Sequence, residues 1–139
     1  MRNYSSLLVV VGSLCLLITL VLAWCLVGIR SSAFMKGLFP NYQNLLKAHL
    51  DYLMMTGLLM IFFLLFNHFR VSPPAVVVLA MCAGSFMNPV GFIALAIRPT
   101  LRQQPTSPFG MVMAASFSLT TIGYAGAAWL IGQAALLAL

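Results

Sequence analysis

Residues 7–29 read LLVVVGSLCLLITLVLAWCLVGI and contain no charged side chain. About 20 mostly apolar helical residues cross the hydrocarbon core of a bilayer, where each backbone N–H and C=O must be satisfied within its own helix. The stretch therefore predicts a transmembrane helix. Residues 48–66, 75–97 and 109–137 are similarly apolar, and Asp51 is the one Asp, Glu, Lys or Arg among them. We expect an all-α, integral membrane four-helix bundle that forms one domain over residues 1–139.

The composition excludes a water-soluble fold. Of the 139 residues, 63% are hydrophobic and 6% are charged, whereas about a quarter of the residues in ordinary soluble domains are charged. The fourth stretch is longer than a bilayer requires, so it is expected to tilt, to kink near Gly123 or to extend beyond the lipid. These three alternatives stay open at the level of sequence.

The first stretch also has features of a cleaved secretory signal, because Arg2 precedes an apolar run. The run is long for such a signal, and no small residues flank a cleavage site. Trp24 stands before Cys25, where a lipoprotein signal requires a small residue. We therefore expect the segment to be retained as a membrane span.

The basic residues occur singly in short loops, although the net charge is +6. This pattern favours membrane lipid or an anionic cofactor as the counter-charge, and not nucleic acid. The first and third loops are richer in cations, which predicts that they face the cytoplasm and that both termini lie outside, in a prokaryotic inner membrane. The richer loops carry Arg30, Lys36, Lys47, Arg98 and Arg102, and the opposite side carries Arg2 and Arg70.

Prolines mark the ends of the predicted spans, because proline interrupts regular helix. The longest loop, residues 30–47, contains Phe34, Leu38, Phe39 and Tyr42. Aromatic and aliphatic residues in such a loop predict a segment that lies in the membrane interface.

Small residues four positions apart recur in the fourth stretch. Helices in lipid associate through close van der Waals contact, which small residues permit. Such a face packs against a neighbouring helix of the same chain or of another copy, and a cofactor-sized site in so small a protein would need walls from more than one subunit. We expect a homo-oligomer. The pairs are Ser116 with Thr120, Gly123 with Ala127, and Ala128 with Gly132.

The second stretch concentrates polar residues, which are costly inside a membrane and are therefore functional candidates. Asp51 is the only acidic residue in the chain. At about 100° per residue, His49, Tyr52 and Thr56 share one helix face and Asp51 lies nearly opposite His49. Asp51 is therefore expected to meet Lys47, one turn away, or a cation from a neighbouring helix.

His49 permits three interpretations: an interfacial histidine, a proton-transfer group or an axial ligand of a metal or haem. His68 lies 19 positions later, about 28 Å along a continuous helix, so the two imidazoles of one chain cannot share a metal. Cations near the start of the His49 helix would suit the anionic propionates of haem. Lipid phosphates would suit the same cations equally well.

In the third stretch, Asn88 precedes Pro89. A proline inside a helix leaves a carbonyl one turn earlier without its usual donor, and the resulting kink opens space. The Asn88 amide in that space is expected either to orient a polar ligand atom or to bond a neighbouring helix or the broken turn.

Two segments resemble the small four-span family that contains styrene oxide isomerase and the hydroxylaminobenzene mutases. Ala48-His49 followed by Gly57-Leu58-Leu59-Met60 is similar to the family's Ala-His start and later Asn-Gly step. Residues 88–92, Asn-Pro-Val-Gly-Phe, are similar to its Asn-Val-Gly-Phe stretch with Pro89 inserted.

The resemblance implies a trimer that binds ferric haem b between subunits, with His49 as the axial ligand. The iron would act as a Lewis acid in an isomerase or mutase, rearranging a small apolar substrate without a redox partner. Tyr52 and Asn88 would then orient the substrate, and Lys47, Arg98 and Arg102 would meet the propionates. The substrate contacts expected on this basis are Met55, Thr56, Phe92 and Ile93.

The chain departs from the family at the substrate side. Thr56 replaces the asparagine before the glycine, and Ile93 replaces the tyrosine that follows Gly-Phe. These changes leave the substrate undefined, between an epoxide and an arylhydroxylamine. The alternative function is a non-catalytic helix-bundle subunit or a haem-binding electron carrier. A small transporter ranks last, because it would require more internal polar groups or inverted repeats.

Overall fold

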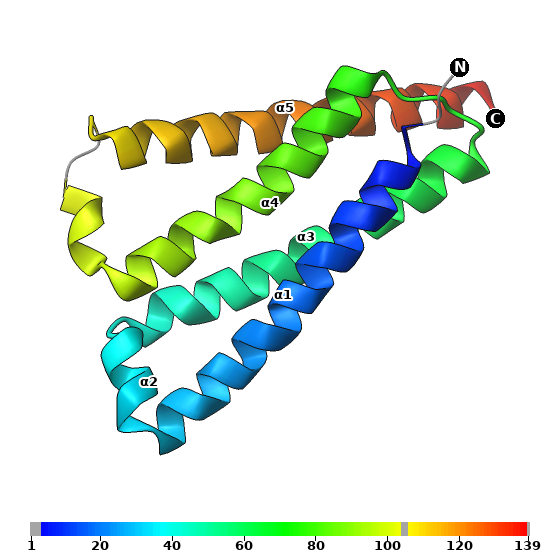
Figure 1. Cartoon of the computed structure of the whole chain (residues 1–139). Coiled ribbons are helices and arrows are strands. Elements are labelled where there is room, and N and C mark those ends of the chain that lie inside the picture. The colour runs from blue at the N-terminus through cyan, green and yellow to red at the C-terminus, as the bar shows by residue number, and fades with distance from the viewer. Residues whose placement is uncertain (1–3, 104–105, 139) are drawn as a thin grey trace.

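The computed structural model describes residues 4–103 and 106–138, apart from the side chains of residues 102 and 103. This part of the chain is helical and contains no strand, which confirms the predicted all-α class (Figure 1). Four helices are long and apolar enough to cross a membrane. The elements are α1 (Ser6–Ser31), α2 (Ala33–Leu38), α3 (Tyr42–His68), α4 (Ala75–Ile97), the 3-10 helix η1 (Pro99–Gln103) and α5 (Pro108–Leu137).

Helix α3 contains the predicted second span, residues 48–66, and extends beyond it at both ends. Helix α3 begins at Tyr42 and not at position 48, because Asn41 caps it by accepting a hydrogen bond from the Asn44 N–H at 3.1 Å. A side-chain acceptor at this position satisfies one of the free N–H groups of the first turn. His49 consequently lies two turns inside the helix and not at its beginning.

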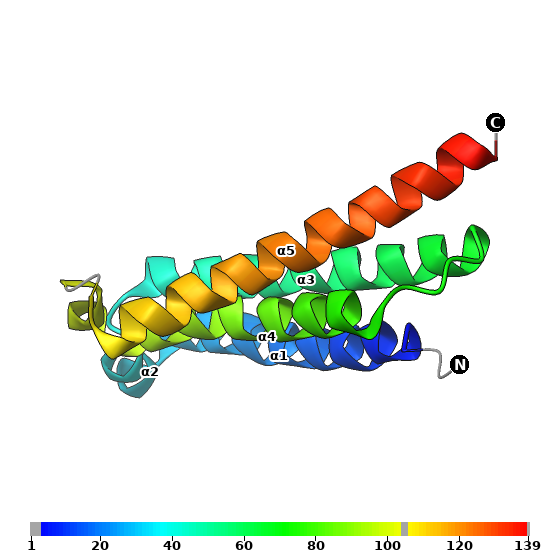
Figure 2. The same ribbon diagram turned by 90° about the horizontal axis from the view of Figure 1, so that it is seen from above.

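The helices pack in chain order around α3 and α4. Helices α1 and α3 run antiparallel along most of their lengths, α3 packs against α4, and α4 packs against α5. Contact between α1 and α4 is less extensive, and α5 meets α3 only slightly. Figure 2 shows the C-terminal end of α5 diverging from the other spans. The bundle is therefore a compact group of α1, α3 and α4 with α5 attached through α4.

The seam between α4 and α5 depends on two glycines that let the backbones approach. A Cβ atom on Gly84 would lie 2.5 Å from the Thr120 backbone nitrogen, and one on Gly123 would lie 2.5 Å from that of Met81. Ser116 and Ala127 are also buried here, so two of the three predicted small-residue pairs pack against a helix of the same chain. Gly123 is a contact point, and α5 runs unbroken through it.

The third small-residue pair behaves differently from the other two. Ala128 and Gly132 are exposed, and a Cβ atom on Gly132 would meet nothing within 4 Å.

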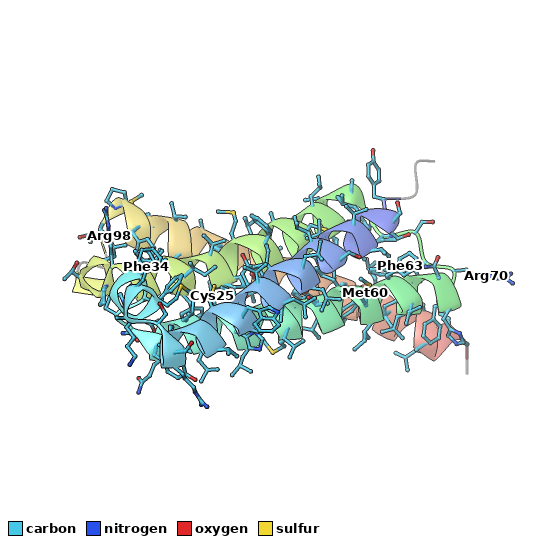
Figure 3. All side chains as sticks on the ribbon, turned by 60° about the horizontal axis from the view of Figure 1, so that its bottom comes forward. Cys25, Phe34, Met60, Phe63, Arg70 and Arg98 are labelled. Carbon is cyan, nitrogen blue, oxygen red and sulfur yellow. The ribbon has the colours of Figure 1, made fainter. Side chains whose placement is uncertain are left out.

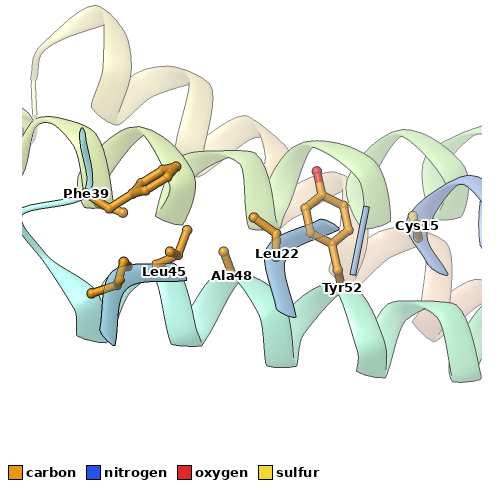
Figure 4. Close-up of a cluster of buried hydrophobic side chains, with 8 residues drawn as sticks. Cys15, Leu22, Phe39, Leu45, Ala48 and Tyr52 are labelled. Carbon is orange, nitrogen blue, oxygen red and sulfur yellow. The ribbon is translucent and has the colours of Figure 1, made fainter. Parts of the chain in front are cut away.

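Two clusters of buried side chains form the core. The cluster nearer α2 joins α1, α3 and α4, and Figure 4 shows its packing around Ala48 and Tyr52. The second cluster, nearer the termini, is centred on Leu59, Phe66 and Met81. Its buried members are Leu8, Leu59, Phe66, Val78, Met81, Cys82 and Ala127.

The two ends of the bundle differ in charge. Figure 3 places Arg98 and Phe34 at the end that contains α2, and Arg70 at the opposite end. Phe34 is 76% exposed whereas Phe39 is buried, so α2 presents one aromatic ring outward and the chain anchors another in the core. The predicted contribution of Arg2 lies outside the described residues.

Candidate functional site

Helix α3 has an inner face in the core and an outer face that no other helix covers. Tyr52, Leu59 and Ala48 point inward and are buried. The outer strip is apolar and about half exposed, at Leu50 and Met54 for example. Polar side chains occupy the two edges of this strip.

His49 lies on the edge of the strip that faces α1. Its Nδ1 atom is 3.1 Å from the backbone carbonyl oxygen of Thr19. Because a carbonyl can only accept a hydrogen bond, Nδ1 carries the proton and Nε2 of the neutral ring keeps its lone pair. Metal-binding histidines are usually fixed in this way, with the second ring nitrogen donating to a carbonyl or carboxylate. The chemistry of His49 therefore fits an axial ligand of haem iron.

Thr19 is itself held in place, because its side-chain hydroxyl donates to the Cys15 carbonyl at 2.9 Å. It is buried in α1. The histidine is thus oriented by a backbone group, whose position depends on helix packing and not on residue type. This is why the sequence contains no signal for Thr19.

Asp51 lies on the other edge of the strip, facing α4. Its Oδ2 atom accepts a hydrogen bond from Nδ2 of Asn88 at 2.9 Å. The expected partner was a cation such as Lys47, so the structure corrects that prediction: the hydrogen-bonded partner is a carboxamide. Asn88 was expected either to orient a ligand atom or to bond a neighbouring helix or the broken turn. The structure shows a bond to a neighbouring helix, because the Asn88 amide donates to Asp51 of α3. With Nδ2 engaged, the carbonyl oxygen of Asn88 has no hydrogen bond to another described residue.

A shallow groove of about 290 Å³ runs beside Asp51. It opens to the surroundings of the bundle, and its walls are mainly apolar. Such a groove suits a small apolar molecule that has one or two polar atoms. The lining residues are Lys47, Leu50, Asp51, Met54 and Phe92.

Tyr52 lies on the inner face of α3 and is 1% exposed. Its hydroxyl donates to the Phe86 carbonyl oxygen at 3.0 Å, and its ring meets the Phe86 ring edge-on. Figure 4 shows the hydroxyl pointing toward α4. Phe86 adjoins Ser85, whose carbonyl loses its usual helical donor because residue 89 is proline. Tyr52 therefore bonds the turn that precedes Pro89, and its predicted contact with substrate stays a prediction.

The predicted substrate residues are divided between the core and the groove. Met55 and Thr56 are buried, and the Thr56 hydroxyl donates to the Tyr52 carbonyl at 2.9 Å. Phe92 and Ile93 both pack against the cluster around Tyr52, and Phe92 also lines the groove beside Asp51. Only Phe92 of these four therefore lines the groove beside the partly buried Asp51–Asn88 pair.

The predicted propionate cations are also separated from His49. Lys47 lines the groove on the Asp51 edge of α3. Arg98 is exposed and follows the last residue of α4. The backbone of Arg102 belongs to η1, but its side chain lies outside the described residues.

Among the described residues, no three histidine, cysteine, aspartate or glutamate side chains gather where they could hold a metal ion. His68 is exposed at the far end of α3. A metal bound through one histidine would need its other ligands from a macrocycle, a substrate or a second copy.

No protein-family model, curated protein or solved structure matches the chain. The residues themselves therefore carry the argument for function. They offer one imidazole with a fixed tautomer and one carboxylate–carboxamide pair, at opposite edges of an uncovered apolar helix face.

Proposed function

We propose that this chain is a haem b-dependent membrane isomerase or mutase. It would catalyse a redox-neutral rearrangement within a small apolar substrate, from an epoxide to an aldehyde or from an arylhydroxylamine to an aminophenol. The observation that carries the proposal is the 3.1 Å contact between His49 Nδ1 and the Thr19 carbonyl, because it leaves Nε2 available as a single axial ligand.

Ferric haem, when bound, supplies a Lewis acid that polarises an oxygen atom of the substrate. His49 would hold the group, and its ring is oriented by the hydrogen bond to the Thr19 carbonyl of α1. Its second nitrogen cannot swing away without losing that hydrogen bond.

Asp51 and Asn88 bind and orient the substrate in this scheme. The carboxylate fixes the Asn88 amide, so the amide oxygen is directed consistently. Phe92 and Met54 provide apolar walls for a hydrocarbon or aromatic group. A dry, apolar setting also keeps water from diverting a reactive cation, and a substrate dissolved in lipid can enter from the side.

A homo-oligomer is part of the proposal. His49 and Asp51 lie at opposite edges of the outer strip of α3, and the strip between them is uncovered in one copy of the chain. A second copy packed on this strip would enclose a ligand between the two polar edges. We expect a trimer, from the family resemblance, in a prokaryotic inner membrane with the cation-rich loops in the cytoplasm.

The test is the absorption spectrum of detergent-purified protein after reconstitution with haem, recorded before and after dithionite. Wild type is compared with His49→Ala, and His68→Ala serves as the matched control at the other end of the same helix. We expect a Soret band in wild type and His68→Ala, and its loss in His49→Ala. Epoxides and arylhydroxylamines are then screened with the loaded protein.

Two results would contradict the proposal. A wild-type spectrum without haem bands after reconstitution would leave a non-catalytic helix bundle. A His49-dependent band that changes reversibly with dithionite, in a protein that rearranges neither substrate class, would favour the electron carrier.

A further inference from the structure

A second groove, which the proposed function does not use, lies where α1 ends and α3 begins. Its volume is about 310 Å³, and it is lined by Leu26, Val27, Arg30 and Tyr42. The walls combine two aliphatic side chains with a guanidinium group and a phenol. Arg30 is in the last turn of α1 and Tyr42 is the first residue of α3.

This groove continues the same helix seam that holds His49. Seven residues separate Thr19 from Leu26 on α1, and seven separate Tyr42 from His49 on α3. Seven residues are close to two helical turns, so each pair shares a face, and the rise is about 10 Å. Because the helices are antiparallel, the groove lined by Leu26 and Tyr42 lies about two turns along the seam from the Thr19–His49 contact.

The residues that lie along the seam between the groove and the Thr19–His49 contact are apolar. Ala23 follows Thr19 by four positions, and Leu46 precedes His49 by three. Both residues are half-buried, and the alanine leaves little bulk in the seam. A flat apolar group could therefore lie along the seam, in contact with His49 and with one edge in the groove.

The groove suits an anionic oxygen group. The only acidic side chain in the chain, Asp51, lies on the other edge of α3, so Arg30 is not paired with an acidic side chain of its own copy. A guanidinium forms strong, often bidentate hydrogen bonds to carboxylates and phosphates. The Tyr42 hydroxyl can donate a further bond, and the start of α3 contributes the positive end of a helix dipole.

We propose that Arg30 and Tyr42 hold the propionate carboxylates of the haem that His49 ligates. This inference rests on the proposed function, and it replaces the cations expected from sequence, since Lys47 faces the other groove and Arg98 follows α4. The phosphate of an anionic lipid has the same chemistry. The alignment with His49 favours the propionates, because a porphyrin carries both carboxylates on one edge, away from its iron.

The experiment titrates protein in neutral phosphatidylcholine nanodiscs with ferric haem b and, separately, with its dimethyl ester, which lacks the carboxylates. Affinity is read from the Soret band and not from activity. The variants are Arg30→Gln, Arg30→Lys and Tyr42→Phe. Arg98→Gln is the matched control, because it removes an exposed arginine from the same end of the bundle. Circular dichroism and size-exclusion profiles verify that each variant is folded.

Wild type is expected to bind haem about 10- to 100-fold more tightly than the ester, the loss typical of a charged hydrogen bond. Arg30→Gln should lose this preference while binding the ester as wild type does. Arg30→Lys should keep part of the preference, Tyr42→Phe should lose less than Arg30→Gln, and Arg98→Gln should behave as wild type.

An unchanged preference for haem over ester in Arg30→Gln would overturn the inference alone, provided that His49→Ala still abolishes binding. The lipid source is tested by adding phosphatidylglycerol. If Arg30→Gln removes stabilisation by this lipid and leaves haem affinity intact, the groove binds lipid phosphate and the inference fails. If folded wild type binds no haem, the proposed function itself is rejected, and the inference about Arg30 and Tyr42 falls with it.

Discussion

The seam between α4 and α5 and the outer face of α3 are both apolar, but they differ in how deeply their polar side chains are buried. Along the α4–α5 seam, Ser85 Oγ lies 2.8 Å from the Tyr124 hydroxyl and the Thr120 hydroxyl bonds its own helix, whereas Ser116 Oγ is buried without a hydrogen-bond partner among the described residues. On α3, His49 and Asp51 lie at the edges of an exposed strip. Both sets of hydrogen bonds join helices, but Ser85 and Ser116 are fully buried whereas His49 and Asp51 are only partly buried.

The difference follows from what lipid penalises. A polar group facing hydrocarbon without a partner is costly. Small residues let α4 and α5 approach closely enough to enclose such groups. No other described helix covers the outer strip of α3, and a ligand or a second copy on this strip remains our proposal.

The largest loss of stability is expected where the backbones of α4 and α5 lie closest together. Gly84→Leu should prevent α4 and α5 from packing, because even a Cβ atom would lie 2.5 Å from the Thr120 backbone nitrogen. Overpacking typically costs about 1–3 kcal/mol and more where backbone must move. The measurement is thermal unfolding in detergent, followed by circular dichroism.

The matched control is Gly132→Leu, because a Cβ atom there meets nothing within 4 Å. It should leave the unfolding midpoint unchanged. Equal destabilisation by both substitutions would show that the seam has no special role.

An intermediate effect is expected at the polar edge of α3. Asn88→Leu removes the amide that bonds Asp51, and should cost about 1–3 kcal/mol because a partly buried carboxyl loses its partner. Asp51→Leu combined with Asn88→Leu should recover part of that loss, since neither polar group remains. A double-mutant cycle in detergent measures this coupling. Strictly additive losses would mean that the pair contributes nothing as a pair.

The smallest effect is expected on the inner face of α3. Tyr52→Phe keeps the ring and removes only the hydrogen bond to the Phe86 carbonyl. The expected loss of stability is about 0.5–1.5 kcal/mol, with haem affinity unchanged. A large loss of haem affinity without loss of stability would instead place Tyr52 at the site, as its sequence context first suggested.

The spans were predictable because hydrophobicity is a local property. Residues 75–97 match α4 at both ends, since proline-rich segments bound them. The start of α3 was missed because residues 42–47 are polar enough to resemble a loop, yet the Asn41 cap and contacts with α1 and α4 extend the helix. His49 and Asp51 therefore lie inside the helix rather than at its start.

The candidate site was predictable only in part. His49, Asp51 and Asn88 were selected because polar groups in a membrane are expensive, and the near-opposite placement of His49 and Asp51 followed from helix periodicity. The pairing of Asp51 with Asn88 involves positions 37 apart, a relation set by how α3 and α4 pack. For the same reason, the expected cation partner of Asp51 was wrong.

The sequence by itself determined that this protein is a bundle of four membrane helices, because composition, span length and proline boundaries act locally along the chain. Only the tertiary structure decided which polar atoms face each other. Thr19 reaches His49 through a backbone carbonyl, and Arg30 and Tyr42 share a groove because two antiparallel helices align them. Such relations depend on the register between helices, which is fixed by side-chain packing across the whole bundle.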